Sequence, residues 1–151
     1  MLENFLQPIE ITFLVNVVLC IIIGFFIGAE RESRGKDAGI HIHTMVIVGS
    51  MLFTLLSHIV DPESTSRIAS GIVTGIGFLG AGIILRDGTN VRNLTTAASI
   101  WVSGAIGMAI GFGYYGIAVI AMVASVIIPR LPHLHNKSPE AMNVNSSQQK
   151  K

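Results

Sequence analysis

The chain has 151 residues, of which 50% are hydrophobic and only 13% are charged, and its formal net charge is +1. This length leaves room for one domain, and so apolar a composition predicts a membrane protein rather than a soluble one. Because the net charge is close to zero, the chain lacks the basic excess that is typical of nucleic-acid binding. Any electrostatic signal must therefore lie in the placement of its charges.

Five apolar segments follow one another along the chain, and we expect each to be a transmembrane helix. The first, residues 11–29, is long enough to cross about 30 Å of hydrocarbon at about 1.5 Å per residue. No lysine or arginine precedes it, so it does not resemble a secretory signal peptide, and we expect it to remain in the mature protein. The other segments are residues 44–60, 68–85, 96–113 and 114–128, and the last is the shortest, so four spans are the alternative.

The positive charges predict how these segments are oriented, since lysines and arginines collect on the cytoplasmic side of short loops. With five spans and the amino terminus outside, nine of the ten lysines and arginines fall inside and only Arg67 falls outside. A bundle of four spans would move the positive charges that follow residue 129 to the outside and erase this asymmetry. We therefore predict five spans, with the amino terminus outside and the carboxyl terminus in the cytoplasm.

The composition of the chain changes after Pro129. Residues 131–151 contain too few apolar side chains to build a core, and we expect them to form a polar, disordered cytoplasmic tail. Residues 1–130 are then one all-α membrane domain, in which five transmembrane helices pack around a central, glycine-rich third helix.

The third segment contains the pattern G-x-G-x-x-G at Gly75, Gly77 and Gly80. A dinucleotide-binding fingerprint would need an acidic residue about twenty positions later, and residues 95–104 contain none. A Walker A motif would need a lysine directly after the last glycine, where this chain has Ala81. We therefore expect no nucleotide and no other cofactor at this segment.

On a helix, the glycines of the third segment occupy two faces and its aliphatic residues occupy another. Small residues let membrane helices approach closely, so we expect the small faces to pack against other helices and the aliphatic face (Ile72, Ile76, Leu79 and Ile83) to meet lipid. Small residues at every fourth position of the fourth segment make that segment the expected partner. The predicted packing residues are Gly71, Gly75, Gly77, Gly80, Gly82, Ser99, Ser103 and Gly107.

The sequence indicates two further roles for glycine residues in these membrane segments. Gly24 and Gly28 form a small pair on the first segment and predict another close helix contact there. Alternatively, the many glycines of the third segment break its helix and free backbone carbonyls to coordinate a cation, as in transporters. Packing is the commoner role of glycine in membrane helices, so we favour packing.

Four stretches of the chain resemble the MgtC/SapB family of bacterial inner-membrane proteins. They are GAERE (28–32), AGIHIH (38–43), RIASGIVTGIGFLGAGIILRDG (67–88) and VRNLTTAASIWVSGAIGMAIG (91–111), within a likeness that extends over about residues 15–122. The pairing of GIGFLGAG with LTTAA makes the resemblance specific. It implies a location in the bacterial inner membrane and a role in growth and homeostasis at low magnesium, with some members acting as virulence factors.

The resemblance also implies a mode of action. Members of the family have been regarded as accessories of magnesium transport, and some are reported to restrain the membrane ATP synthase. This chain departs from the family pattern in two places, because His41-Ile42 stands where Arg-Thr is usual and Asn93 stands where a glycine is usual. Many relatives also carry a soluble carboxyl-terminal domain, whereas only the polar tail follows the spans here, so we expect no regulation through such a domain.

Charged and polar residues gather at the cytoplasmic ends of the predicted spans, and helix packing would bring them into one inner-face cluster. Topology alone explains part of this placement, because a charge at the centre of a span costs about 2.5 to 3.5 kcal/mol and basic side chains anchor at the membrane edge. Two acidic residues in GAERE gain nothing from anionic lipid, and they favour a functional role. The inner-face cluster comprises Glu30, Arg31, Glu32, His43, Arg86, Asp87, Thr95 and Thr96.

The sequence predicts neither a metal site nor a catalytic group. His41, His43 and Asp37 fall short of a zinc site, and no Asp or Glu lies within a predicted span to bind Mg²⁺. No nucleophile or triad is visible, so we expect no enzyme. Two hypotheses follow. The first is a protein that contacts and regulates another membrane complex, such as the ATP synthase, and that can form homo-oligomers. The second is a Mg²⁺ transporter, or a subunit of one, that works through the glycine-rich span.

Overall fold

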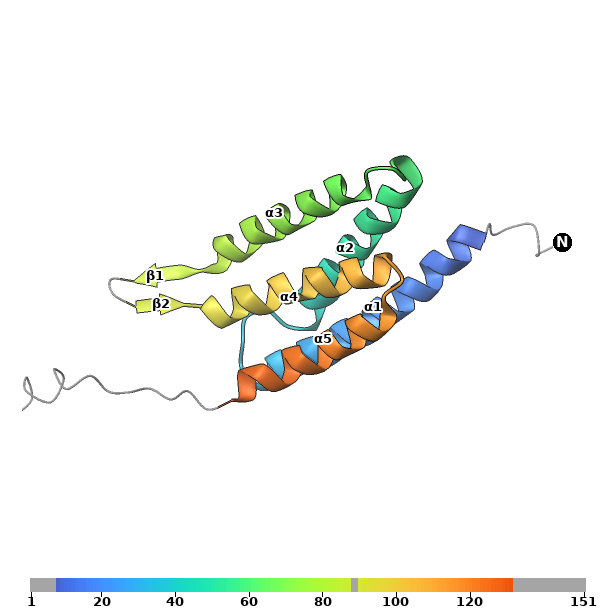
Figure 1. Cartoon of the computed structure of the whole chain (residues 1–151). Coiled ribbons are helices and arrows are strands. Elements are labelled where there is room, and N and C mark those ends of the chain that lie inside the picture. Colours follow the sequence, from blue (N-terminus) through green and yellow to red (C-terminus); the bar gives the residue numbers. More distant parts are fainter. Residues whose placement is uncertain (1–7, 88–89, 132–151) are drawn as a thin grey trace, which may run out of the picture.

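The computed structural model describes residues 8–87 and 90–131, which form five antiparallel α-helices and one short β-hairpin (Figure 1). The first helix begins at the end of the bundle opposite to the one where the last helix finishes. The predicted tail, apart from Leu131, falls outside the described residues. The elements are α1 (Pro8–Ser33), α2 (Ile40–Val60), α3 (Thr65–Ile83), β1 (Leu85–Asp87), β2 (Asn90–Arg92), α4 (Leu94–Gly111), α5 (Tyr115–Ile127) and a final 3₁₀ turn, η1 (Ile128–Arg130).

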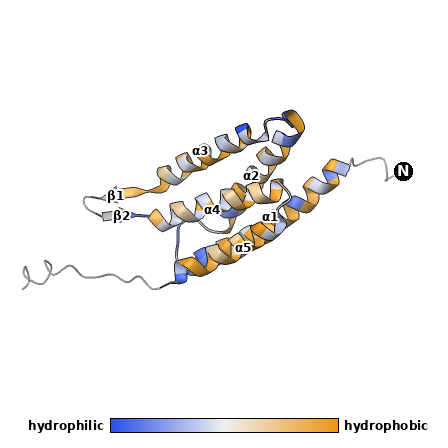
Figure 2. Ribbon diagram, viewed as in Figure 1, coloured by the Kyte–Doolittle hydropathy of each residue, from blue (hydrophilic) through white to orange (hydrophobic). Residues whose placement is uncertain are grey.

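The five helices confirm the predicted all-α membrane fold. Helices α1 to α4 are each long and apolar enough to cross a membrane. Helix α5 has 13 residues and extends over about 20 Å, so it is the shortest, as the sequence predicts. Apolar residues cover much of the outer surface of the helices (Figure 2), where Phe78 and Ile120 are 81% and 72% exposed. Such a surface is suited to lipid rather than to water.

Helices α2 and α4 form the centre of the bundle, because α4 contacts the four other helices and α2 packs against α1, α3 and α4. Its contact with α1 is close since Gly24 and Gly28 bring the two backbones together. A Cβ atom at Gly24 would collide with Thr44, and one at Gly28 would collide with the backbone of Ile40. The predicted packing role of this glycine pair is therefore confirmed.

Helices α3 and α4 are in contact, as predicted, but the regularly spaced small residues of α4 pack against α2 instead of α3. A Cβ atom at Gly107 would collide with the carbonyl oxygen of Ile47, and one at Gly111 would lie 2.6 Å from the Cβ of Thr54. Ser99 and Ser103 of the same series are buried. The regular spacing of small residues on α4 thus identifies a packing face correctly, but its partner is α2.

The predicted orientation of α3 is largely reversed. A Cβ atom at Gly71, Gly75, Gly77 or Gly82 would meet nothing within 4 Å, whereas one at Gly80 would lie 3.7 Å from Ala97. The aliphatic residues Ile72 and Ile76 are buried instead, each only 7% exposed. The reason lies on α4, where Gly104 leaves a space that the Cδ1 atom of Ile76 fills.

Helix α3 also differs from the prediction in its position and in its continuity. It packs mainly against α4 and α2 and lies at the edge of the bundle in Figure 1, not at its centre. It is continuous over Thr65–Ile83, so the alternative of a helix broken by glycine is wrong. After it, β1 and β2 form an antiparallel hairpin that the sequence did not predict.

Asn93 ends this hairpin in a left-handed backbone conformation, with φ at 65°. Glycine adopts this conformation most easily, and asparagine is among the few other residues that tolerate it. The Nδ2 atom of Asn93 also donates a hydrogen bond to the carbonyl oxygen of Ile83, at 3.2 Å, near the carboxyl end of α3. Asparagine is therefore a conservative replacement for the glycine that the family resemblance leads one to expect here.

Candidate functional site

A network of polar residues is buried at the end of the bundle where α1 and α5 finish and where α2 and α4 begin. Its core is Arg31 of α1, which is 1% exposed. The Nη2 atom of Arg31 donates a hydrogen bond of 3.0 Å to Oγ1 of Thr96 on α4. The Nε atom of Arg31 is buried and has no hydrogen-bond partner. The hydroxyl of Thr96 therefore serves a contact across helices.

Glu30 lies beside Arg31 and is 7% exposed. Its Oε1 atom accepts from Nη1 of Arg34 at 3.3 Å and lies 3.5 Å from Nε of Arg130. Arg34 also donates to the carbonyl oxygen of Pro129 at 2.7 Å, so these contacts tie α1 to the end of α5. The second carboxylate oxygen of Glu30, Oε2, is buried without a partner.

His43 extends the network to α2 and is 0% exposed. Its Nδ1 atom lies 2.8 Å from the carbonyl oxygen of Gly39, and because a carbonyl only accepts, Nδ1 carries a proton. Its Nε2 atom lies 3.2 Å from Oγ of Ser99, whose hydroxyl also lies 2.8 Å from the carbonyl oxygen of Thr96. We call Glu30, Arg31, His43, Thr96 and Ser99 the buried polar network.

Glu32 and Thr95 of the inner-face cluster lie outside this network. Glu32 accepts a hydrogen bond of 2.9 Å from the backbone N–H of Ile40, which holds the start of α2. Thr95 is exposed. Arg86 and Asp87 belong to β1, whose backbone lies at the same end of the bundle as the network (Figure 1). That their side chains face Glu30 and Glu32 stays a prediction.

Sequence reasoning missed Arg34 and Arg130 as partners of Glu30, and it assigned Ser99 to helix packing alone. Arg34 lies four positions after Glu30 on one helix, and this spacing brings side chains together. This contact could therefore have been predicted from the sequence. Arg130 is one hundred positions away, and only the return of α5 to this end of the bundle brings it near.

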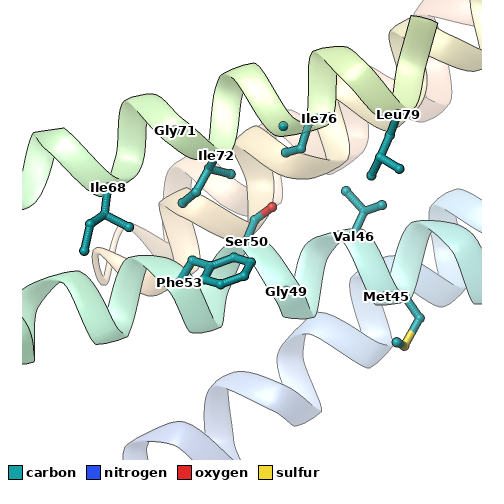
Figure 3. A pocket seen from close by; sticks show the side chains of 11 residues that line it. Met45, Val46, Gly49, Ser50, Phe53, Ile68, Gly71, Ile72, Ile76 and Leu79 are labelled. Atoms are coloured by element: carbon teal, nitrogen blue, oxygen red, sulfur yellow. The ribbon is translucent and has the colours of Figure 1, made fainter. Parts of the chain in front are cut away.

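A cavity of about 610 Å³ lies between α2 and α3 (Figure 3). Ile68 and Leu79 of α3 point toward α2 at this cavity. Ser50 is the only polar side chain among the residues that line it, and Gly71 and Gly75 border it from α3. Such a lining is suited to apolar material and offers almost nothing to a hydrated ion. Within the part of the chain that the structure describes, no three His, Cys, Asp or Glu side chains are placed to hold a metal ion.

These features define a multi-pass α-helical membrane protein with a buried polar network at one end of its helix bundle. Comparison with known sequences assigns it more closely. The sequence profile of the MgtC family matches residues 17–136, and the chain belongs to that family.

Three relatives illustrate the similarity. MgtC of Salmonella typhimurium (strain LT2) is 39% identical over 131 residues, which cover 84% of this chain and 57% of that protein. YhiD of Escherichia coli (strain K12), whose name suggests a magnesium transporter, is 40% identical over 145 residues, or 88% of this chain and 65% of that protein. MgtC of Brucella abortus (strain 2308) is 43% identical over 111 residues, or 73% of this chain and 47% of that protein.

The chain spans only about half to two thirds of the length of these relatives. No solved structure matches it.

Proposed function

We propose that the chain acts in adaptation to low magnesium, as a non-catalytic protein of the bacterial inner membrane that contacts and regulates another membrane complex. Membership of the MgtC family and the name of the relative YhiD support a role connected with magnesium. The ATP synthase is the partner that the family resemblance implies. In this proposal the amino terminus lies outside and the end that carries the buried polar network faces the cytoplasm.

The buried polar network is the observation that carries this proposal. Removing two charged groups such as Glu30 and Arg31 from water costs several kcal/mol each. A protein in which apolar residues of similar size replace such a buried pair is often at least as stable. Charged residues kept inside a membrane bundle are for this reason candidates for function. The network also fixes Arg34 and Arg130, whose side chains are 38% and 61% exposed, at the end face of the bundle. Fixed charges on such a face give a protein contact specificity.

Growth at low magnesium tests this proposal in a strain that lacks its own copy of the gene. We expect Arg130→Gln to abolish the growth that the wild-type chain restores, because it removes an exposed charge while Arg34 still pairs with Glu30. Arg67→Gln, an exposed change at the opposite end of the bundle, is the matched control and is expected to grow normally. Normal growth with Arg130→Gln, at wild-type levels of protein in the membrane, would contradict the proposal. The buried polar network would then only hold the helices together at the membrane edge.

The alternative function is transport of Mg²⁺, and the name of YhiD is its main support. The fold offers little to an ion that prefers carboxylate oxygens and retained waters. Glu30 is the only buried carboxylate among the side chains that the structure describes, and two arginines already contact its Oε1 atom.

Purified chain in liposomes that contain a magnesium-sensitive dye distinguishes the two functions. We expect no Mg²⁺ flux above that of empty liposomes. Gly75→Leu serves as the probe, because Gly75 lines the cavity between α2 and α3 and has open space at its Cβ position. Saturable flux that this change removes would contradict the contact proposal and support a transporter.

A further inference from the structure

A second cavity, of about 430 Å³, lies between α4 and α5 at the end of the bundle that holds the buried polar network. Its volume falls within the range of about 300 to 1,000 Å³ that is typical of small-molecule sites. Ala98 and Val102 line it from α4, and Ala121 and Ala124 line it from α5. These side chains are small, and they leave an apolar trough between the two helices. We call this cavity the α4–α5 groove.

The end of the α4–α5 groove toward the tip of the bundle is cationic. Arg31, Arg34 and Lys36 line it there, and no carboxylate is among its lining residues. Arg34 is engaged by Glu30, which Arg130 also contacts. Lys36 is exposed and forms no ion pair with any side chain that the structure describes.

Arg31 places a buried donor without a partner at this end of the groove. Its guanidinium is almost completely buried, it lines the groove, and its Nε–H has no acceptor. A buried charged donor without a partner costs free energy that an anionic oxygen in the groove would recover. Guanidinium groups bind phosphate oxygens through strong, charge-assisted hydrogen bonds. The exposed hydroxyl of Thr95 also lines the groove and can donate to such an anion.

We propose that the α4–α5 groove binds one anionic phospholipid of the surrounding bilayer. Its phosphate lies against Arg31 and Lys36, and one acyl chain lies in the trough between Ala98 and Ala124. The charge of the cationic end matches the headgroup, and basic pockets between membrane helices recognise lipid headgroups in this way. A free phosphate would fill only the cationic end and leave the apolar part of the groove empty, so the shape favours a lipid. The proposal is independent of the regulatory role and of its partner.

Native mass spectrometry of the full chain in detergent tests the proposal, with phosphatidylglycerol and phosphatidylcholine of identical acyl chains as the probes. Each basic residue near a membrane surface contributes about 1 kcal/mol to anionic lipid binding, or about fivefold in affinity. We expect phosphatidylglycerol to bind at least about fivefold more tightly than phosphatidylcholine, and Lys36→Gln to weaken it by about fivefold. Arg67→Gln, at the other end of the bundle, should leave this preference unchanged. Equal binding of the two lipids by the wild-type chain would overturn the proposal.

A second pair of variants tests the apolar part of the groove. Ala124→Phe fills the trough and is expected to abolish the retention of phosphatidylglycerol. Ala105→Phe, at an exposed position of α4 outside the groove, is the matched control and should retain the lipid. Unchanged retention by a folded Ala124→Phe variant would overturn the proposal. So would retention of inorganic phosphate by both the wild-type chain and Ala124→Phe without any preference for phosphatidylglycerol, because the site would then belong to a free phosphate.

Discussion

Arg31 shows most clearly how single residues constrain this molecule. A guanidinium that is 1% exposed inside a membrane bundle must find its hydrogen bonds within the protein, since lipid offers none. Thr96 accepts one of these bonds, and it is joined through Ser99 to His43 on α2. Three helices are thus linked by side chains that a bilayer disfavours individually.

We expect Thr96→Val to destabilise the chain by about 1.5 to 3 kcal/mol, because it removes the acceptor of a buried, charged donor without changing the size of the side chain. Thr95→Val is the matched control, since the neighbouring hydroxyl is exposed, and it should change stability by less than about 0.5 kcal/mol. Equilibrium unfolding in mixed detergent micelles measures both. Equal stability of the two variants would show that the bond from Arg31 to Thr96 contributes nothing.

The sequence did not decide between the two roles of Thr96. A threonine at the start of a helix can cap free N–H groups or reach a neighbouring helix, and both roles use the same hydroxyl. The structure assigns the contact to Arg31 because α1 and α4 meet at this level. Glu30 and Arg34 were predictable from their spacing on one helix, whereas Arg130 and Ser99 depend on how the helices are arranged.

At the scale of helices, small residues determine which surfaces meet. Gly107 of α4 sits directly against the backbone of α2, while Gly75 of α3 faces open space. The two glycines look alike in the sequence, because each lies in an apolar helix four positions from another glycine. Their different surroundings lead to opposite expectations for the same substitution.

We predict that Gly107→Ala destabilises the bundle by about 1 to 3 kcal/mol, because the new methyl group collides with the carbonyl of Ile47, which belongs to a helix backbone and has little freedom to move. Gly75→Ala should be neutral or stabilise the chain by up to about 1 kcal/mol, since alanine favours the helix and meets no neighbour. The same unfolding assay compares them. A loss of stability in Gly75→Ala as large as that in Gly107→Ala would contradict the packing described for α3.

Helical periodicity explains why the faces of α3 were found but their orientation was not. A helix with a small face and an aliphatic face can pack through either one, and a single sequence does not show the opposing surface. Here Gly104 of α4 makes room for Ile76, so the aliphatic face turns inward. The positions of the helices were easier to predict, because length and apolar composition determine them directly.

At the scale of the whole molecule, five passes place the two ends of the described chain at opposite ends of the bundle (Figure 1). The distribution of lysines and arginines then predicts which end faces the cytoplasm. Lys36 follows α1, Arg67 lies in the first turn of α3, and the length of α2 separates them. These two positions therefore report on opposite sides of the membrane.

Labelling of single cysteines tests the orientation. Cys20 is buried, and after its replacement by alanine the chain has no other cysteine. The reagent is a membrane-impermeant maleimide, added to cells whose outer membrane is permeabilised and whose inner membrane is intact. We expect it to label Arg67→Cys and to leave Lys36→Cys unlabelled until the inner membrane is disrupted. The reverse pattern would place the buried polar network on the outer side.

In the proposed function, the end face of the bundle contacts another membrane complex when magnesium is scarce. Crosslinking in native membranes at low magnesium, followed by purification of the chain, tests it most directly. We predict that one membrane complex, with the ATP synthase as the expected case, is captured by the wild-type chain and by Arg67→Gln but is lost with Arg130→Gln. Capture of no membrane complex by the wild-type chain, or undiminished capture by Arg130→Gln, would contradict the claim.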